Sequence, residues 1–482
     1  MEKNAVIWIY HNDQPLKIAT IRAHDYGGPL RVEIRYVPKL DDMPGLSAML
    51  PPSRMRDGAI IHMVTELEPL PVVIRHLVPP NTNDNFQRRL LLASLRDQNI
   101  SPPAGFETDW ALLMYCGHGT IGHLNVFESD ELALQWFNER ESVDQFFAED
   151  SRLTEILSEH MQWLNSHKDD HVARAPALGG SPNVGGMIPK ILASIHRDGY
   201  RGTFNLPQNR PAFFDETYTD VIIKYQPEKY QGMAALEAFS LAFHKQLGFE
   251  VPRYWFGSLN KYATLLVERF DRDIQGRPLY QESLFSVLNL ILAKEFKTGL
   301  SSSFLNVATA LTASNLPLNL SMIQREHFFD RLCLALLTGN GDLHLENLSF
   351  CHNGGEYQFT PVYDSTPMAA FAGHTMYLPL ELSNKGDCLK NGYLAPDIKD
   401  QLIAVGLEIG LKNASFRVDK WVGKIPSYLA QLQRINEDFI PQTLEKQASS
   451  HQLSDDIIEK LQVPEKRIKD LINRLNSLLL RF

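Results

Sequence analysis

The sequence predicts an α+β fold of two lobes, in which a β-rich N-terminal module precedes a mixed lobe and a mainly helical C-terminal lobe. Three observations predict it. Short strand-like runs fill residues 5–37, two strands flank a long helix at 233–247, and helical periodicity dominates from residue 281 onward apart from one hairpin. With 482 residues, 44% of them hydrophobic, the chain can bury a large core.

The composition narrows the class of protein. The chain carries 47 basic and 57 acidic residues, and this formal charge of −10 argues against a broad nucleic-acid-binding surface. The four cysteines are scattered without a C-x-x-C pair, so we expect neither a disulfide framework nor a cysteine zinc site. The N-terminus lacks a long apolar segment and no later run is long enough to cross a bilayer, so we expect a soluble, cytoplasmic protein without membrane contact.

Four segments make up the predicted organisation. The β-rich module covers 1–127, where strand-like runs are separated by turn residues such as Asn12 and Asp13. Residues 128–170 have an acidic, helical pattern, which predicts a helical pair that packs on the module as a local insertion. Residues 171–275 open with a Gly-rich loop and hold the strands and the helix of the mixed lobe, and 276–482 form the helical lobe.

The residues that indicate chemistry are concentrated at 339–347. Asp342 and Asn347 have the D-x-x-x-x-N spacing that places a base for an acceptor hydroxyl and one metal ligand in a single turn. The two strand-like runs within 348–363 are joined by a Gly-containing turn, so a hairpin would return Asp364 to the neighbourhood of Asn347. Two oxygen ligands would meet there, which predicts an ATP- and Mg²⁺-dependent phosphotransferase. The alternative is that Asp342 is an ordinary turn acid and Asp364 caps a loop.

A phosphate-binding cation is expected on a strand upstream of this loop. Lys224 ends the apolar run at 221–223, as a lysine placed over nucleotide phosphates does, although lysines at strand ends are often merely solvated. Glu237 lies on the following helix. It either orients Lys224 as an ion-pair partner or, in the interpretation that we favour, is a surface acid.

Other candidates for nucleotide binding are weaker. The Gly-rich loop that ends in Gly185 and Gly186 has backbone N–H groups that could approach phosphates, but it matches neither G-x-G-x-x-G nor a P-loop, and a plain linker is the alternative. Lys190 either adds a second positive charge near the phosphates or caps this loop. His344 lacks a recognisable zinc spacing with its neighbours, so we interpret it as a structural or phosphate-facing group.

Five segments occur in one order along the chain: Gly-Gly-Met-Ile-Pro-Lys190, Val-Ile-Ile-Lys224, Val-Glu-Arg-Phe-Asp-Arg272, Gly-Asp-Leu-His-Leu-Glu-Asn347 and Pro-Val-Tyr-Asp364. In this order the chain resembles the HipA family of serine/threonine kinases, which are toxins of bacterial type II toxin–antitoxin modules. The N-terminal module, with its Gly-His-Gly turn, also resembles the small domain that precedes the kinase in that family. The resemblance therefore implies a protein-kinase-like fold over most of the chain.

The resemblance implies the roles already inferred for Lys224, Asp342, Asn347 and Asp364, with ATP and Mg²⁺ as cofactors. As partners it implies a protein substrate, such as a translation factor or an aminoacyl-tRNA synthetase, and a helix-turn-helix antitoxin through which DNA would be contacted indirectly. Two rivals stay open. One is a small-molecule kinase of the aminoglycoside or choline type, and the other is an inactive ATP-binding partner of a DNA-binding antitoxin.

Three further residues take a role from the resemblance alone. Glu268 and Phe270 are implied to lie at the hinge against adenine, a role that the residues themselves do not indicate. Ser181 is the candidate for an autophosphorylated serine in the Gly-rich loop. The piece between Ser181 and the glycine pair is longer here than the family pattern leads us to expect.

Overall fold

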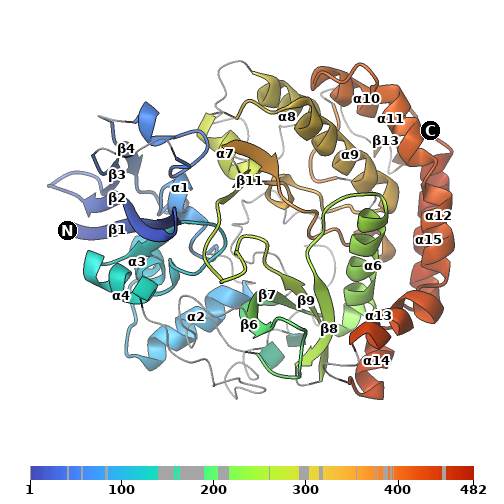
Figure 1. The fold of residues 1–482 in the computed structure, drawn as a ribbon, viewed down its shortest axis with the longest axis horizontal. Helices are drawn as coiled ribbons and strands as arrows, with labels where there is room; N and C mark the ends of the chain where they lie inside the picture. The colour runs from blue at the N-terminus through green and yellow to red at the C-terminus, as the bar shows by residue number, and fades with distance from the viewer. Residues whose placement is uncertain are drawn as a thin grey trace. The chain divides into compact units, whose positions relative to one another are not determined.

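The computed structural model gives the architecture of most of the chain (Figure 1). The residues that it describes are 2–38, 40, 43–55, 58–81, 85–138, 157–159, 161–162, 189–204, 217–259, 261–291, 303–313, 318–353, 355–374, 376, 378–383, 389–390, 393–394, 396–447 and 452–482. The chain divides into two compact units. The first comprises Met1–Met161, Gly180–Ile223 and Glu268–Glu282, and the second comprises Gln162–Gly179, Lys224–Val267 and Ser283–Phe482.

The first unit contains an antiparallel five-stranded sheet of order β4-β3-β2-β1-β5. Its strands are β1 (Glu2–His11), β2 (Gln14–His24), β3 (Arg31–Tyr36), β4 (Ile60–Met63) and β5 (Asn125–Phe127). The hairpin between β1 and β2 turns at Asn12 and Asp13, which have φ values of 48° and 61°. Positive φ at both central residues is the tight turn that matches the twist of paired strands, and Asn and Asp tolerate it. The predicted β-rich start of the chain is therefore confirmed.

Helices accompany this sheet within the first unit. They are the 3₁₀ turn η1 (Pro52–Arg54), α1 (Val72–Arg75), α2 (Phe86–Asp97), α3 (Phe106–Cys116) and α4 (Asp130–Asn138). Helix α4 packs on the sheet through a buried cluster of Val6, Trp8, Phe127, Ala133 and Phe137. The start of the segment 128–170 is thus helical as predicted, and most of the remainder, 139–156 and 163–170, lies outside the described residues. That this segment is an insertion stays a prediction.

Two more strands of the first unit are β6 (Lys190–His196) and β7 (Tyr218–Tyr225), whose last two residues belong to the second unit. They are hydrogen-bonded neighbours. Ser194 on β6 donates from Oγ to Asp220 on β7 at 3.0 Å, and both residues are buried. The buried hydroxyl of Ser194 thereby has an acceptor.

From Lys224 onward, the second unit contains a short 3₁₀ turn, a helix and a hairpin. These elements are η4 (Glu228–Tyr230), α6 (Met233–Gln246), β8 (Tyr254–Leu259) and β9 (Tyr262–Glu268), with β8 and β9 antiparallel. The predicted strands at 220–225 and 262–270 and the helix between them are confirmed. Strand β8 was not predicted, because Gly257 and Ser258 interrupt its hydrophobic run.

The rest of the second unit is mainly helical. Its elements after the short strand β10 (Gln281–Ser283) are α7 (Leu284–Ile291), α8 (Phe304–Thr312), α9 (Met322–Thr338), η5 (Leu345–Asn347), β11 (Ser349–Asn353), β12 (Glu356–Phe359), η6 (Met368–Ala370), β13 (Leu389–Lys390), β14 (Tyr393–Leu394), α10 (Ile398–Glu408), α11 (Ala414–Val422), α12 (Ile425–Gln433), the π-helix η7 (Ile435–Phe439), α13 (Ile440–Gln447), α14 (Asp455–Leu461) and α15 (Glu465–Leu479). The α+β class, with sheets early and helices late, is confirmed. Among the described helices, none is both long enough and apolar enough to span a membrane.

Helix α9 forms the centre of this helical region. Ser321 caps its N-terminus by accepting a hydrogen bond from the backbone of Gln324, and every residue from Phe328 to Thr338 is buried. A helix that is buried on all sides belongs to a core. Gly339 ends the helix in the left-handed conformation, with φ of 79°, and donates from its N–H to carbonyls of the last turn. The segment that carries Asp342 therefore begins directly after a rigid helix of the core.

Candidate active site

The loop that follows α9 is held by its own hydrogen bonds. Asn340 accepts the backbone N–H of Asp342 on its side-chain oxygen at 3.0 Å. The side-chain amide of Asn347 donates to the carbonyl oxygen of Asp342 at 2.9 Å, and the N–H of His344 donates to the same carbonyl at 2.9 Å. Asn347 is buried, and with its amide nitrogen engaged its side-chain oxygen is the atom suited to a metal ion. The predicted Asp342–Asn347 turn is thus a closed loop.

The hairpin after this loop returns the chain as predicted. Phe350 on β11 pairs with Phe359 on β12, and the N–H of Thr360 donates to the carbonyl of Ser349 at 2.9 Å. The hydroxyl of Tyr363 then donates to the carbonyl oxygen of Glu346 at 2.5 Å. Because Tyr363 directly precedes Asp364 and Glu346 directly precedes Asn347, the hairpin brings the two predicted metal-binding segments side by side.

Lys224 is buried and bonded to two carboxylates. Its Nζ donates to Oδ1 of Asp364 at 2.7 Å and to Oε1 of Glu237. Burial alone would lower the pKa of Lys224, but the carboxylates of Asp364 and Glu237 raise it above its ordinary range. Lys224 is therefore a fixed positive charge at neutral pH, and the alternative of a solvated strand-end lysine is wrong.

Glu237 corrects our expectation of a surface acid. Its side chain lies on α6 and is 3% exposed. Besides the bond to Lys224, its second oxygen accepts the hydroxyl of Thr366 at 3.1 Å. An acid on an amphipathic helix looks the same in sequence whether it faces solvent or a buried lysine, so spacing alone did not distinguish the two.

Asp364 differs from Glu237 in exposure and in backbone conformation. Its side chain is 26% exposed, whereas that of Lys224 is 8% exposed. Its φ of 51° is in the left-handed region, which Asp tolerates better than most residues. Such conformations concentrate at functional sites. The exposed edge of the carboxylate is where a ligand can reach this cluster, which we call the lysine cluster (Lys224, Glu237 and Asp364).

The oxygen atoms of this region fit a magnesium ion that shares its coordination with a nucleotide. Mg²⁺ is commonly held by one or two protein oxygens, with water and phosphate oxygens completing the shell. Asn347 and Asp364 offer such a pair. Within the part of the chain that the structure describes, no group of three or more His, Cys, Asp and Glu side chains forms a self-sufficient metal cage. The donors therefore suit a metal that arrives with phosphates.

His344 has a structural contact in the loop. It caps the short helix η5, and its Nδ1 accepts the backbone N–H of Glu346 at 3.2 Å. This contact agrees with a structural role for His344. Nε2 is the ring nitrogen that would make any phosphate contact.

Arg331 is a residue of this site that sequence reasoning missed. It projects from α9, is 3% exposed, and donates to the carbonyl oxygens of Asn347 at 3.0 Å and Thr360 at 3.2 Å. Burial lowers its pKa to about 10. The one side chain thus joins the loop of Asn347 to the strand that leads to Asp364, in contacts that no local sequence pattern encodes.

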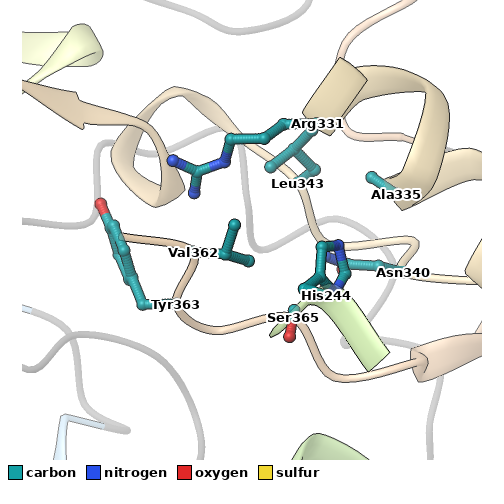
Figure 2. A pocket seen from close by; sticks show the side chains of 8 residues that line it. All are labelled: His244, Arg331, Ala335, Asn340, Leu343, Val362, Tyr363 and Ser365. Carbon is teal, nitrogen blue, oxygen red and sulfur yellow. The ribbon is translucent and has the colours of Figure 1, made fainter. Parts of the chain in front are cut away.

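A small cavity lies behind the loop, and Figure 2 shows the side chains around it. Its lining residues are His244, Arg331, Ala335, Asn340, Leu343, Val362, Tyr363 and Ser365. Burial lowers the pKa of His244 to about 4, so this imidazole is neutral at physiological pH. The cavity belongs to the support of the loop, because most of its lining comes from α9 and from the segments on either side of the hairpin.

The remaining predicted site residues belong to the first unit or lie outside the described residues. Lys190 is the first residue of β6 and is half-buried. Glu268 and Phe270 are half-buried, and Glu268 accepts the hydroxyl of Thr219 at 2.9 Å. Their contact with adenine stays a prediction. Ser181, Gly185 and Gly186 lie outside the described residues.

The neighbours of Glu268 and Phe270 in the sequence form a buried ion-pair cluster. Arg269, Asp271 and Arg272 are buried, and together with Asp220 we call them the arginine cluster. Asp271 accepts hydrogen bonds from Arg269 at 2.7 Å and Arg272 at 3.0 Å, and from the N–H of Gly122 at 2.8 Å. This segment therefore binds the N-terminal module at Gly122, close to its Gly-His-Gly turn.

The guanidinium groups of the arginine cluster complete this contact. Arg269 donates to the carbonyl oxygens of Gly119 at 3.1 Å and Thr120 at 2.6 Å, and Arg272 donates to that of Gly122 at 3.0 Å. Sequence reasoning saw only charged residues after a strand. The partners of these guanidinium groups are main-chain carbonyls, which leave no signal in the sequence.

Comparison with known proteins agrees with these observations. A protein of Haemophilus influenzae named "Putative kinase" is 29% identical over 240 residues, which are 46% of this chain and 68% of that protein. A HipA chain from the complex of the Shewanella oneidensis MR-1 toxin–antitoxin system, HipA, HipB and operator DNA, has a TM-score of 0.56. It is 18% identical and the match covers 98% of this chain and 96% of that chain, a likeness that shows the fold.

The family model for the HipA-like C-terminal domain matches residues 183–427, which are half of the chain and include Lys224, the loop of Asp342 and Asp364. This confirms the resemblance on which the sequence-based prediction depended. The chain belongs to the HipA-like C-terminal domain family.

Proposed function

We propose that the protein is a serine/threonine protein kinase that transfers the γ-phosphoryl group of ATP, with Mg²⁺, to a bacterial protein. One observation carries the proposal. Lys224, buried on its strand, is bonded both to Glu237 of the following helix and to Asp364, at the end of the hairpin that returns to Asn347. A strand lysine, a helix glutamate and a metal-binding aspartate are the arrangement that phosphoryl transfer by protein kinases requires.

The proposal gives each side chain a role. The ammonium group of Lys224 is positioned to neutralise nucleotide phosphates, and Glu237 holds it in place from a buried position. Asn347 and Asp364 are the residues that would hold Mg²⁺, which supplies neutralisation of charge on the phosphates when it is bound. Asp342 would orient the acceptor hydroxyl and take its proton at a carboxylate oxygen.

The same proposal assigns the nucleotide and phosphorylation residues of the first unit. Glu268 and Phe270 would contact adenine, with Lys190 and the Gly185–Gly186 pair near the phosphates. Ser181 would be the autophosphorylated serine. A phosphopeptide map of ATP-treated protein should show phosphate at Ser181 in the wild type and none in Asp342→Ala.

We further propose that the protein is the toxin of a toxin–antitoxin pair. The relative from Shewanella oneidensis is in a complex with HipB and operator DNA. A similar DNA-binding antitoxin would explain how a chain with a formal charge of −10 is linked to DNA without a broad basic surface of its own. Expression of the wild type should then arrest growth, and Asp342→Ala should relieve the arrest.

Radiolabelled ATP added to purified protein and a whole lysate tests the activity. We expect label in protein bands, lost in Asp342→Ala. Label found only in small molecules would support the rival small-molecule kinase. Binding of Mg-ATP without transfer to this protein or to any lysate protein would support an inactive partner of an antitoxin instead.

A further inference from the structure

The C-terminal helix α15 contacts segments that carry residues of the proposed active site. It is strongly amphipathic, with Ile468, Leu471, Leu475 and Leu478 buried. Its two arginines, Arg467 and Arg474, are seven residues apart and therefore lie on one face of the helix, two turns from each other.

Arg467 binds the turn that precedes α6. Its guanidinium donates to the carbonyl oxygen of Lys229 at 2.5 Å and to that of Gln231. These carbonyls lie immediately before Gly232, the N-cap of the helix that carries Glu237. The same guanidinium lies over the ring of Phe371, 4.7 Å from its centroid.

Arg474 binds the segment that follows Asp364. It donates to the carbonyl oxygens of Ala369 at 2.9 Å and His374 at 2.7 Å. His374 in turn lies 3.1 Å from the hydroxyl of Tyr230, in the turn that Arg467 binds. The two arginines thus connect the turn before the helix of Glu237 with the segment that follows Asp364.

Two glycines show how closely α15 and the residues just before it approach the segments of the proposed active site. A Cβ atom on Gly232 would lie 2.7 Å from the Cα of Val463, and one on Gly339 would lie 2.8 Å from a methyl group of Leu471. Both glycines have positive φ, 80° and 79°, so the backbone itself also favours glycine. Gly339 comes just before the loop of Asp342, so α15 also packs against the start of that loop.

We propose that α15 is a positioning element for phosphoryl transfer, with Arg467 and Arg474 as its positioning residues. The inference rests on the proposed function and deepens it. Arg467 binds carbonyls just before α6, and Arg474 binds carbonyls in the segment after Asp364. The two arginines therefore fix the distance between the start of α6 and that segment. Glu237 and Asp364 can meet at Lys224 only while that separation is kept.

The test compares Arg467→Gln and Arg474→Gln with Arg467→Lys, Arg474→Lys and the matched control Lys469→Gln. Lys469 is on the same helix, is 70% exposed and pairs with Glu465. For each variant, kcat, KM for ATP and the Mg²⁺ concentration for half-maximal rate are measured alongside thermal unfolding. We expect kcat to fall about tenfold to a hundredfold in the glutamine variants, because small displacements of catalytic groups have effects of that size.

The other readouts separate positioning from plain stability. We expect the half-maximal Mg²⁺ concentration to rise in the glutamine variants, KM for ATP to change less than kcat, the lysine variants to recover part of the rate, and Lys469→Gln to match the wild type. A lower unfolding temperature with unchanged kcat and Mg²⁺ dependence for the folded protein would overturn the inference.

Hydrogen exchange of the full-length protein gives a readout that does not depend on activity. Exchange should increase together at the start of α6 and at residues 366–374 in both glutamine variants. If the wild type transfers no phosphate, the proposed function fails, while this joint increase would still show that α15 holds the two segments together. An increase confined to the segment that each arginine itself contacts would overturn the inference.

Discussion

The arginine cluster of the first unit and the lysine cluster of the second are built from the same kind of ion pair. In the arginine cluster, Arg269 and Asp271 are 2% and 3% exposed, and the remaining guanidinium donors go to backbone carbonyls of the Gly-His-Gly turn. In the lysine cluster, the carboxylate of Asp364 is 26% exposed. The first cluster is closed, and the second has an edge that a ligand can reach.

Exposure distinguishes a structural ion pair from a functional one. A buried charge lowers stability unless it is paired and hydrogen-bonded, and Asp271 accepts hydrogen bonds from Arg269, Arg272 and Gly122. A cluster that binds a ligand has to leave part of a charged group accessible, even at some cost in stability. Exposure of the carboxylate therefore indicates function better than the pairing itself.

The largest effect is expected for Asp271→Asn. This substitution leaves two buried guanidinium groups without their shared carboxylate, and the free energy of unfolding should fall by about 3–5 kcal/mol. Denaturant unfolding measures it. The control is Glu465→Gln, which removes an exposed pair with Lys469 and should change stability by about 0.5 kcal/mol or less. A similar small change for Asp271→Asn would mean that the arginine cluster is not structural.

Asp364→Asn should reduce activity strongly and stability only slightly. Transfer of phosphate should fall about 10²–10³-fold, the usual loss when one group that stabilises the transition state is removed. Stability should change by on the order of 1 kcal/mol, because Lys224 keeps its bond to Glu237. Initial rates with labelled ATP and denaturant unfolding are measured on the same sample. Full activity in Asp364→Asn would contradict the assignment of the lysine cluster to catalysis.

Glu237→Gln should have a smaller effect on activity. Glutamine keeps the shape and can still accept the hydroxyl of Thr366, and Lys224 keeps its bond to Asp364. We expect kcat to fall about tenfold, from misplacement of the lysine. Glu228→Gln, an exposed acid near the start of the same helix, is the matched control and should leave the rate unchanged. Equal rates in the two variants would show that Glu237 does not position Lys224.

The parts of the site that were predicted are the ones encoded locally. Asp342 and Asn347 are five residues apart, and the hairpin that returns Asp364 is marked by its Gly-containing turn, so spacing and turn chemistry were sufficient. The burial of Glu237 was not predictable, because its partner lies on another element. The hinge residues Glu268 and Phe270 came from the resemblance alone.

The parts that were missed depend on contacts between distant segments. Arg269 meets the carbonyl of Thr120 across 149 positions of the chain, and Arg474 meets that of Ala369 across 105. Each is an arginine that binds backbone carbonyls, and a carbonyl carries no sequence signal. A pattern search can find side chains that form a motif, but not side chains whose partners are main-chain atoms.

The two clusters should lose their contribution to stability at opposite ends of the pH scale. Burial alone would raise the pKa of Asp271, but Arg269 and Arg272 lower it to about 2. A carboxylate with a lowered pKa contributes stability above its unfolded pKa of about 3.9, and this is lost as pH falls through the folded pKa. Lys224, whose pKa is raised, contributes stability fully below about pH 10.4, lost only as pH rises through its folded pKa. Neither Asp271 nor Lys224 should therefore titrate between pH 5 and 9.

The measurement is the difference in free energy of unfolding between wild type and Asp271→Asn, with sucrose present to stabilise both proteins. Buried neutral histidines such as His244 weaken both proteins below about pH 6.5, and this common effect cancels in the difference. We expect the difference to stay constant from pH 7 to about 4 and then to narrow by about 2 kcal/mol toward pH 2, since each pKa unit corresponds to about 1.4 kcal/mol. Narrowing that begins near neutral pH would mean that Asp271 is not held as a carboxylate by its arginines, and the contrast between a closed and an accessible cluster would fail.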